Sequence, residues 1–213
     1  MDRYSLNSKH ILIISISVFV FASISVLLFQ TNLFSMGSNE DSSNVFFEGA
    51  YLEYNTEVNV EFGNSTDKVS NTVSGKMRQD VIKISTDSIT LRTSSSGELK
   101  DIIGDEEKDT VSTIRKGDSL FDFDINTMDF IGEEKIQTMF GEKNVLHYSI
   151  NEKNSIEGGT SLEIQSVYLG RDNNILLLVE SYSISEMIYR GGIVTSTSNI
   201  RTWLSDTNLE WLK

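Results

Sequence analysis

The 213-residue chain has no cysteine and no proline, and its cations are scarce, with 18 Lys and Arg against 31 Asp and Glu. The absence of cysteine excludes a disulfide framework, a thiolate zinc site, a cysteine nucleophile and a cysteine-linked lipid anchor. A formal net charge of −13 argues against a protein that binds nucleic acid, because the phosphates would repel it. The missing proline suits long, uninterrupted strands whose turns use Gly and Asn.

What the sequence does contain is a long apolar run near the N-terminus. The stretch Ile11–Phe29 carries no charged residue, and its only polar members are serines. Serine hydroxyls can hydrogen bond to the preceding helical turn. As a helix, the run would extend about 28 Å, close to the hydrocarbon thickness of about 30 Å. We therefore predict a transmembrane helix over residues 11–29, which makes the membrane the first partner of the chain.

The charges on either side of the apolar run predict its orientation. Arg3 and Lys9 precede it, whereas residues 30–44 hold two acids and no Lys or Arg. The positive-inside rule then leaves residues 1–10 as a cytoplasmic tail and places the C-terminal part outside the cytoplasm. The sequence thus predicts a single-pass protein of the cell membrane.

A cleaved signal peptide is the alternative to an anchor. Secretory apolar regions usually have about 7–15 residues and end in a small-x-small site. This run is longer, and the best available site, Ser35-Met36-Gly37, is a poor one. We expect an uncleaved signal anchor.

The rest of the chain divides into a tether over residues 30–44, rich in Ser and Asn, and a β-rich domain over residues 45–213. From Val45 onward, apolar and polar residues alternate with a period of two, which is typical of half-buried antiparallel strands. Turn residues separate the predicted strands, which cover Ala50–Phe62, Lys76–Ile84, Ile89–Thr93, Val111–Arg115, Ser119–Ile125, Ile136–Phe140, Val145–Ile150, Ser161–Leu169, Ile175–Ser183 and Ile193–Leu204.

This pattern predicts an all-β, mainly antiparallel domain of ten to twelve strands, formed as a single curled sheet in a sandwich or partial barrel. Glu133–Met139 and Asp206–Leu212 are the only segments outside the apolar run with a short helical pattern. The longest polar loops are expected at Gly97–Asp109 and Asn151–Thr160. Most aromatic residues alternate along strands, which favours core packing, although an aromatic inner face could also hold a lipid or another apolar ligand.

One acidic segment has the spacing of a calcium-binding loop. Four residues occupy positions 1, 3, 5 and 12 of the twelve-residue loop: Asp122, Asp124, Asn126 and Glu133. However, Thr127 stands where the sharp turn needs glycine, and helical patterns do not flank the segment. A strand with solvated acids explains the same residues with fewer assumptions, so we expect no cofactor and keep Ca²⁺ as the alternative. A second acidic cluster surrounds Gly104 and is interpreted as a solvated loop: Asp101, Asp105, Glu106, Glu107 and Asp109.

Catalytic motifs are weak. There is no G-x-S-x-G elbow beside His147, which is expected on a strand as a structural or exposed residue. A zinc site would need further ligands, and His10 lies at the membrane edge. Asn64-Ser65-Thr66 is an N-x-T acceptor in a predicted turn, so Asn64 is a candidate glycosylation site.

Several pieces of the chain resemble a known group of proteins. They are the opening Gly49–Tyr54, the hairpin pattern Thr138-x-x-Gly141-x-x-x-Val145-x-x-Tyr148, Tyr168 with Ile175-Leu176, and the closing Ser205–Leu209. Over residues 49–209 the chain is similar to small, membrane-anchored, exported β-rich proteins of archaea and bacteria. The order of these pieces along the chain resembles that of half-barrel lipoprotein carriers. That resemblance implies a curved sheet that shields an acyl chain, and it carries over no functional residue.

Together, these observations predict an extracytoplasmic domain that acts by binding. The partner would be a lipid-like ligand or another envelope protein, and nucleic acid is excluded by charge. The competing function is a carboxylate- or metal-dependent hydrolase, which would need acids converging on His147 or a tyrosine in a concave site.

Overall fold

The computed structural model describes residues 46–64, 66–98, 109–115, 125–156, 159–189 and 192–213. These residues form nine strands and two 3₁₀ turns: β1 (Tyr51–Gly63), β2 (Lys68–Ile84), β3 (Ser88–Gly97), β4 (Asp109–Arg115), η3 (Ile125–Thr127), β5 (Asp129–Thr138), β6 (Gly141–Ile156), β7 (Gly159–Gly170), β8 (Leu176–Tyr189), β9 (Gly192–Thr207) and η4 (Glu210–Leu212). Within these ranges no helix is both long and apolar enough to cross a membrane. The predicted segment 11–29 lies outside them.

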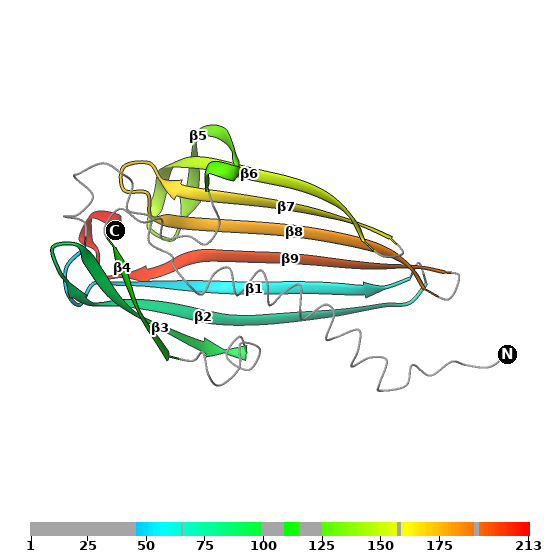
Figure 1. Cartoon of the computed structure of the whole chain (residues 1–213), viewed down its shortest axis with the longest axis horizontal. Helices are drawn as coiled ribbons and strands as arrows, with labels where there is room; N and C mark the ends of the chain where they lie inside the picture. The colour runs from blue at the N-terminus through cyan, green and yellow to red at the C-terminus, as the bar shows by residue number, and fades with distance from the viewer. Residues whose placement is uncertain (1–45, 65, 99–108, 116–124, 157–158, 190–191) are drawn as a thin grey trace.

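All nine strands belong to one antiparallel sheet in the order β4-β3-β2-β1-β9-β8-β7-β6-β5 (Figure 1). Two meanders, β1–β4 and β5–β9, meet where the first strand pairs with the last. This pairing confirms the all-β, antiparallel prediction. The described strands form a single open sheet, so the sandwich alternative is wrong, and their number is nine where ten to twelve were expected.

Two predicted turns are confirmed and show the expected chemistry. Between β2 and β3, the Ser85 N–H donates to the Ser88 carbonyl at 2.8 Å, and the two hydroxyls lie 2.7 Å apart. Between β7 and β8, Asn174 adopts a positive φ of 53°, a conformation that Asn tolerates better than most residues.

Two local predictions are corrected. The expected loop Asn151–Thr160 is mostly strand, because β6 runs to Ile156 and β7 starts at Gly159. Its polar residues lie on a hairpin arm that extends beyond the core, so their polarity reflects exposure rather than a loop. The expected helix Glu133–Met139 lies largely in β5, where its backbone pairs with β6.

Turn positions also shift. The hairpin connection between β5 and β6 is Met139-Phe140, earlier than the predicted turn at Gly141–Asn144, and Gly141 enters β6 with a φ of +89°. The segment Val111–Arg115 lies in β4 and pairs with β3. Its predicted partner Ser119–Ile125 falls outside the described residues except for Ile125, which begins η3. At the C-terminus, helical structure within Asp206–Leu212 is limited to η4.

The hydrophobic core gathers at the end of the sheet that holds the C-terminus (Figure 1). Leu52 and Tyr54 of β1 are fully buried there, together with Leu91 of β3 and Leu176 of β8. The Tyr54 hydroxyl donates to the Leu176 carbonyl oxygen at 3.1 Å, and burial raises the pKa of this phenol above its ordinary value. Core packing of aromatics holds for Tyr54 and Phe46, whereas Phe47, Phe130 and Trp211 are exposed.

Away from the core, the same face of the sheet becomes polar. Thr56 of β1 and Thr202 of β9 share a buried hydroxyl contact of 2.9 Å, and Ser183 of β8 and Ser198 of β9 share a partly buried hydroxyl contact of 2.8 Å. Beyond them, the end of β1 and the start of β2, the end of β6 and the start of β7, and the end of β8 and the start of β9 gather at the end opposite the C-terminus (Figure 1). We call these two ends of the sheet the core end and the tip end.

Candidate functional site

The described residues form two neighbouring hollows at the tip end. One has a volume of about 580 Å³, the other has a volume of about 220 Å³, and both are lined by Ile184 of β8. We call the surface that they form together the tip groove. Its lining residues are Glu61, Asn64, Lys68, Lys153, Thr160, Ser161, Leu162, Ile184, Glu186, Ile193, Thr195 and Thr197.

Strand register explains why these residues meet. Glu61, Thr197, Ile184, Leu162 and Lys153 are successive cross-strand partners on β1, β9, β8, β7 and β6. Side chains of directly opposed residues lie on the same face of a sheet, so the five form one row across it. The row places two apolar side chains in the middle and a charged side chain at each end.

Charged groups flank the groove without filling its floor. Lys68 and Glu61 form an ion pair beside the β1–β2 turn. Lys153 is exposed at the other end of the row, and Glu186 is exposed on β8, two residues beyond Ile184 toward the tip end. A groove with an apolar floor and charged edges suits an amphiphilic ligand better than a purely polar one.

Gly159 permits the close approach of β7 to β8 beside this groove. A Cβ atom at that position would lie 1.8 Å from the Glu186 carbonyl oxygen, which no side chain tolerates. Gly159 therefore has a packing role at the start of β7.

The alternation pattern of the sequence does not predict the apolar floor of the groove. Leu162, Ile184 and Ile193 occur in strands whose alternation indicated a single buried face. The available signal was the segment from Met187 to Val194, where apolar residues occupy consecutive positions and interrupt the period of two.

His147 forms a separate cluster at the core end. Its Nδ1 atom lies 2.8 Å from Glu134 Oε1, and its ring stacks on Tyr168 with centroids 4.4 Å apart. Its Nε2 atom is buried without a hydrogen-bond partner. Burial, followed by the nearby Glu180 and Glu134 carboxylates, raises the pKa of Tyr168. Neither hollow is lined by these residues, so the contact between Glu134 and His147 lies outside the tip groove.

The predicted calcium ligands are only partly described. Glu133 lies in β5, where its carboxylate pairs with Arg171 Nε at 3.2 Å, and Asn126 lies in η3. Asp122 and Asp124 lie outside the described residues. Among the residues that are described, no group of three or more His, Asp or Glu side chains is arranged to hold a metal ion. The calcium site therefore stays a prediction.

Only some of the other predicted site residues lie among the described residues. Asn64 is exposed in the β1–β2 turn, where its Oδ1 accepts hydrogen bonds from the backbone N–H groups of Thr66 and Asp67 at 2.8 Å each. Its glycosylation stays a prediction. In the second acidic cluster, Asp109 begins β4, and the four other acids lie outside the described residues.

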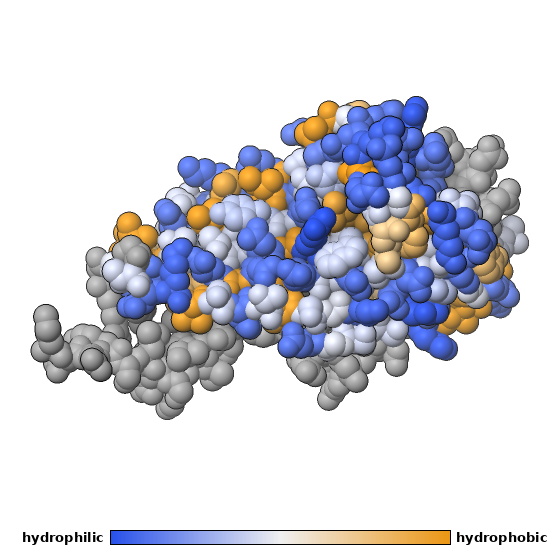
Figure 2. Space-filling model, turned by 180° about the vertical axis from the view of Figure 1, so that it is seen from behind, coloured by the Kyte–Doolittle hydropathy of each residue, from blue (hydrophilic) through white to orange (hydrophobic). Residues whose placement is uncertain are grey.

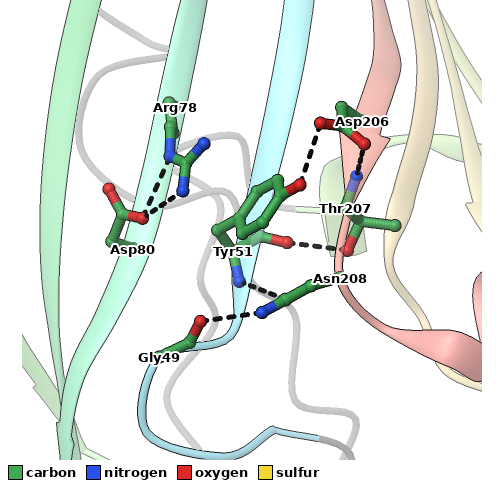
Figure 3. A network of polar contacts seen from close by, with 7 residues as sticks. All are labelled: Gly49, Tyr51, Arg78, Asp80, Asp206, Thr207 and Asn208. Atoms are coloured by element: carbon green, nitrogen blue, oxygen red, sulfur yellow. Dashed lines mark hydrogen bonds and ion pairs between the residues drawn. The ribbon is translucent and has the colours of Figure 1, made fainter.

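A polar network joins the two ends of the β domain at the core end (Figure 3). Asn208 accepts a hydrogen bond from the Tyr51 N–H and donates one to the Gly49 carbonyl, both at 2.9 Å. Thr207 donates to the Tyr51 carbonyl at 2.7 Å, and the Tyr51 hydroxyl donates to Asp206 at 2.8 Å. The last bond raises the pKa of Tyr51.

Arg78 completes this network. Its guanidinium carbon lies 3.8 Å from the Tyr51 ring centroid, and it pairs with Asp80 at 2.9 Å, which raises the pKa of the arginine. The two sequence segments Gly49–Tyr54 and Ser205–Leu209 are therefore partners in space. Their role in the described structure is to close the fold.

One carboxylate of β7 has a shifted pKa. Glu163 of β7 is directly opposite Glu152 of β6. Partial burial, followed by repulsion from Glu152, raises the pKa of Glu163. A like-charged pair in register weakens the β6–β7 arm, which is the arm that borders the tip groove.

No family model and no curated protein matches the sequence. Among solved structures, a lipovitellin structure described by its lipid–protein interactions matches with a TM-score of 0.33 and 10% identity over 77% of this chain and 26% of that one. This chain thus spans about a quarter of the lipovitellin chain. A putative outer membrane lipoprotein-sorting protein domain from Vibrio parahaemolyticus matches with a TM-score of 0.21 and 14% identity, over 74% of this chain and 85% of that one. A DUF1329 family protein from Desulfovibrio piger matches with a TM-score of 0.19 and 12% identity, over 79% of this chain and 89% of that one. Similarities at these scores carry no argument about what this chain binds.

Proposed function

We propose that the chain is a single-pass membrane protein whose acidic β domain lies outside the cytoplasm and binds a lipid-like amphiphile in the tip groove. The observation that carries this proposal is the shared position of Ile184 in both hollows. It makes them one surface with an apolar floor and charged edges. The membrane topology rests on the apolar run and its flanking charges.

The dimensions of the groove support an extended apolar ligand. The row from Lys153 to Glu61 crosses four strand spacings, or about 19 Å at about 4.8 Å per spacing. Leu162 and Ile184 would contact the apolar part of such a ligand. Lys68 and Lys153 lie where an anionic head group can be paired.

Paramagnetic broadening tests this site in the full chain reconstituted in detergent micelles. Isoleucine methyl groups are labelled, and stearate carrying a nitroxide is the probe. We expect the Ile184 and Ile193 signals to broaden because the chain of the probe lies over them. Ile200, on the opposite face and buried, is the internal control.

A matched pair of variants separates groove binding from adsorption to the sheet. Ile184→Ser removes the apolar floor and should reduce broadening at Ile193 at least severalfold. Ile164→Ser makes the same change one row closer to the core and should leave it unchanged. Equal broadening of all exposed isoleucines, or none at Ile184, would refute the groove as a lipid site and favour an envelope protein as its partner.

A further inference from the structure

The end of β8 and the start of β9 project beyond the rest of the described sheet. The last β9 residue paired with β1 is Thr195, opposite Gly63, and the last β8 residue paired with β7 is Met187, opposite Gly159. Ile188 and Ile193 pair with each other beyond both points. This pair therefore has no neighbouring strand on either side within the described residues.

The projecting segment is apolar on both faces. Ile188 and Ile193 are 70% and 63% exposed on one face, and Met187 and Val194 form the next cross-strand pair on the other. We call the described residues at the ends of these two strands, 187–189 of β8 and 192–194 of β9, the β8–β9 tip. Exposed, contiguous apolar side chains are typical of surfaces that insert at a membrane interface.

The neighbouring β1–β2 connection shows that a hairpin end in this sheet need not be apolar. Its residues from Gly63 to Lys68 are Gly-Asn-Ser-Thr-Asp-Lys, and Asn64 closes the turn with its own side chain. Since both connections lie at the same end of the molecule, their difference does not follow from their distance to the core.

We infer that the β8–β9 tip docks on the surface of the lipid bilayer in which the chain is anchored. This inference rests on the proposed function, because it requires the predicted anchor over residues 11–29. It identifies the lipid surface as a partner of the same end of the sheet that carries the tip groove.

The length of chain between anchor and domain brings the bilayer within reach. Residues 30–45 would span about 20–24 Å as a flexible coil. Thr207, the partner of Leu52 at the core end, is 14 residues from Ile193 along β9. At about 3.3 Å per residue, the two residues are about 46 Å apart. A sheet inclined to the bilayer by about 30° then places the tip at the surface without stretching the tether.

Charge selects the kind of lipid surface. The chain is strongly acidic, with a formal net charge of −13, so anionic head groups repel the domain. Docking is therefore driven by the apolar side chains and is favoured on a zwitterionic bilayer.

The absence of cysteine provides a direct test, because one introduced thiol gives a unique label. The full chain carrying Ile193→Cys, labelled with an environment-sensitive nitrobenzoxadiazole dye, is reconstituted in phosphatidylcholine nanodiscs. We expect a blue shift of the emission and quenching by brominated lipid. Val111→Cys is the matched control, since Val111 is equally exposed at 63% but lies on β4. It should show neither effect.

The second measurement identifies the occupant. Adding Ile188→Ser to the labelled chain should abolish the blue shift, and replacing the lipid by phosphatidylserine should reduce it. With a benzophenone label at position 193, the expected product is a lipid adduct. A cross-linked dimer of this chain, or an adduct with another envelope protein, would overturn the inference.

The two proposals fail in different ways. Release of the chain from membranes by alkaline carbonate would refute the anchor, and hence the proposed topology, whatever the tip does. A chain that stays in the membrane while the label at position 193 shows no spectral change would refute docking. Because Ile193 also lines the tip groove, a spectral change that is lost on adding Ile184→Ser, which removes the groove floor, would assign the change to a lipid in the groove and would also refute docking; docking predicts that the change persists in that variant.

Discussion

The core end and the tip end of the sheet are made from the same long strands, yet their side chains meet different surroundings. At the core end, Leu52 and Tyr54 have no exposed surface, and side chains of Thr207 and Asn208 tie the last strand to the first. At the tip end, Ile188 and Ile193 are mostly exposed. The face seen in Figure 2 carries hydrophobic patches separated by hydrophilic residues. Buried contacts are therefore concentrated at the core end, whereas the apolar side chains of the tip end stay exposed to solvent.

The largest expected effect concerns a side chain of the core end. Leu52→Ala should reduce the free energy of unfolding by about 2–5 kcal/mol, because it leaves a cavity where the leucine is fully buried. Ile188→Ala, the matched change at the tip end, should alter it by less than about 0.5 kcal/mol. Urea denaturation of the full chain in micelles, followed by tryptophan fluorescence, measures both. Equal losses would contradict a division between the two ends.

The next effect tests the closing network. Asn208→Ala removes the partners of the Tyr51 N–H and the Gly49 carbonyl and should lower the free energy of unfolding by about 1–2 kcal/mol. Asn199→Ala, at an exposed position within β9, the strand that Asn208 follows, is the control and should have little effect. The same urea denaturation measures both variants. An unchanged denaturation midpoint for Asn208→Ala would show that the network does not stabilise the fold.

One change at the core end should be stabilising. Gln79 is only 1% exposed, and neither polar atom of its side-chain amide has a hydrogen-bond partner. Replacing this amide with leucine removes an unsatisfied buried group, so Gln79→Leu should raise the free energy of unfolding by about 1 kcal/mol. A higher thermal midpoint than that of the natural chain is the expected reading. Destabilisation by this variant would indicate that the amide is satisfied in solution.

The smallest effect depends on pH and involves the arm that reaches the tip end. The raised pKa of Glu163 means that the folded state binds this proton more tightly than the unfolded state does. The resulting stabilisation is complete below the unfolded-state pKa and is lost as the pH rises through the raised folded-state value. Glu163→Gln should therefore flatten the dependence of the melting temperature on pH across the mildly acidic range.

A neighbouring variant serves as the comparison. Glu152→Gln removes only the repulsion, which is the lesser cause, and should flatten the pH dependence less. Calorimetric scans at a series of pH values would distinguish the two variants. A dependence that persists unchanged in Glu163→Gln would assign it to other groups.

Much of the fold follows from local sequence patterns. The period of two predicted antiparallel strands, and turn chemistry located the connections at Ser85–Ser88 and Gly170–Asn174. Prediction failed where a strand leaves the core, as in Asn151–Ile156, because both faces of such an arm are solvated and its sequence loses the alternation that marks a strand. It also failed at Glu133–Met139, where pairing with β6 overrides a weak helical pattern.

By itself, the sequence determined the β class, the acidity and the apolar run, since each depends on composition or on neighbours a few residues apart. Only the tertiary structure decided that Gly49 and Asn208 meet, that Lys153 and Glu61 end one row, and that the Ile188–Ile193 pair projects alone. These facts depend on strand order and register. Pairing the first strand with the last is a long-range choice, which is fixed by the burial of Leu52 and Tyr54 rather than by any local pattern.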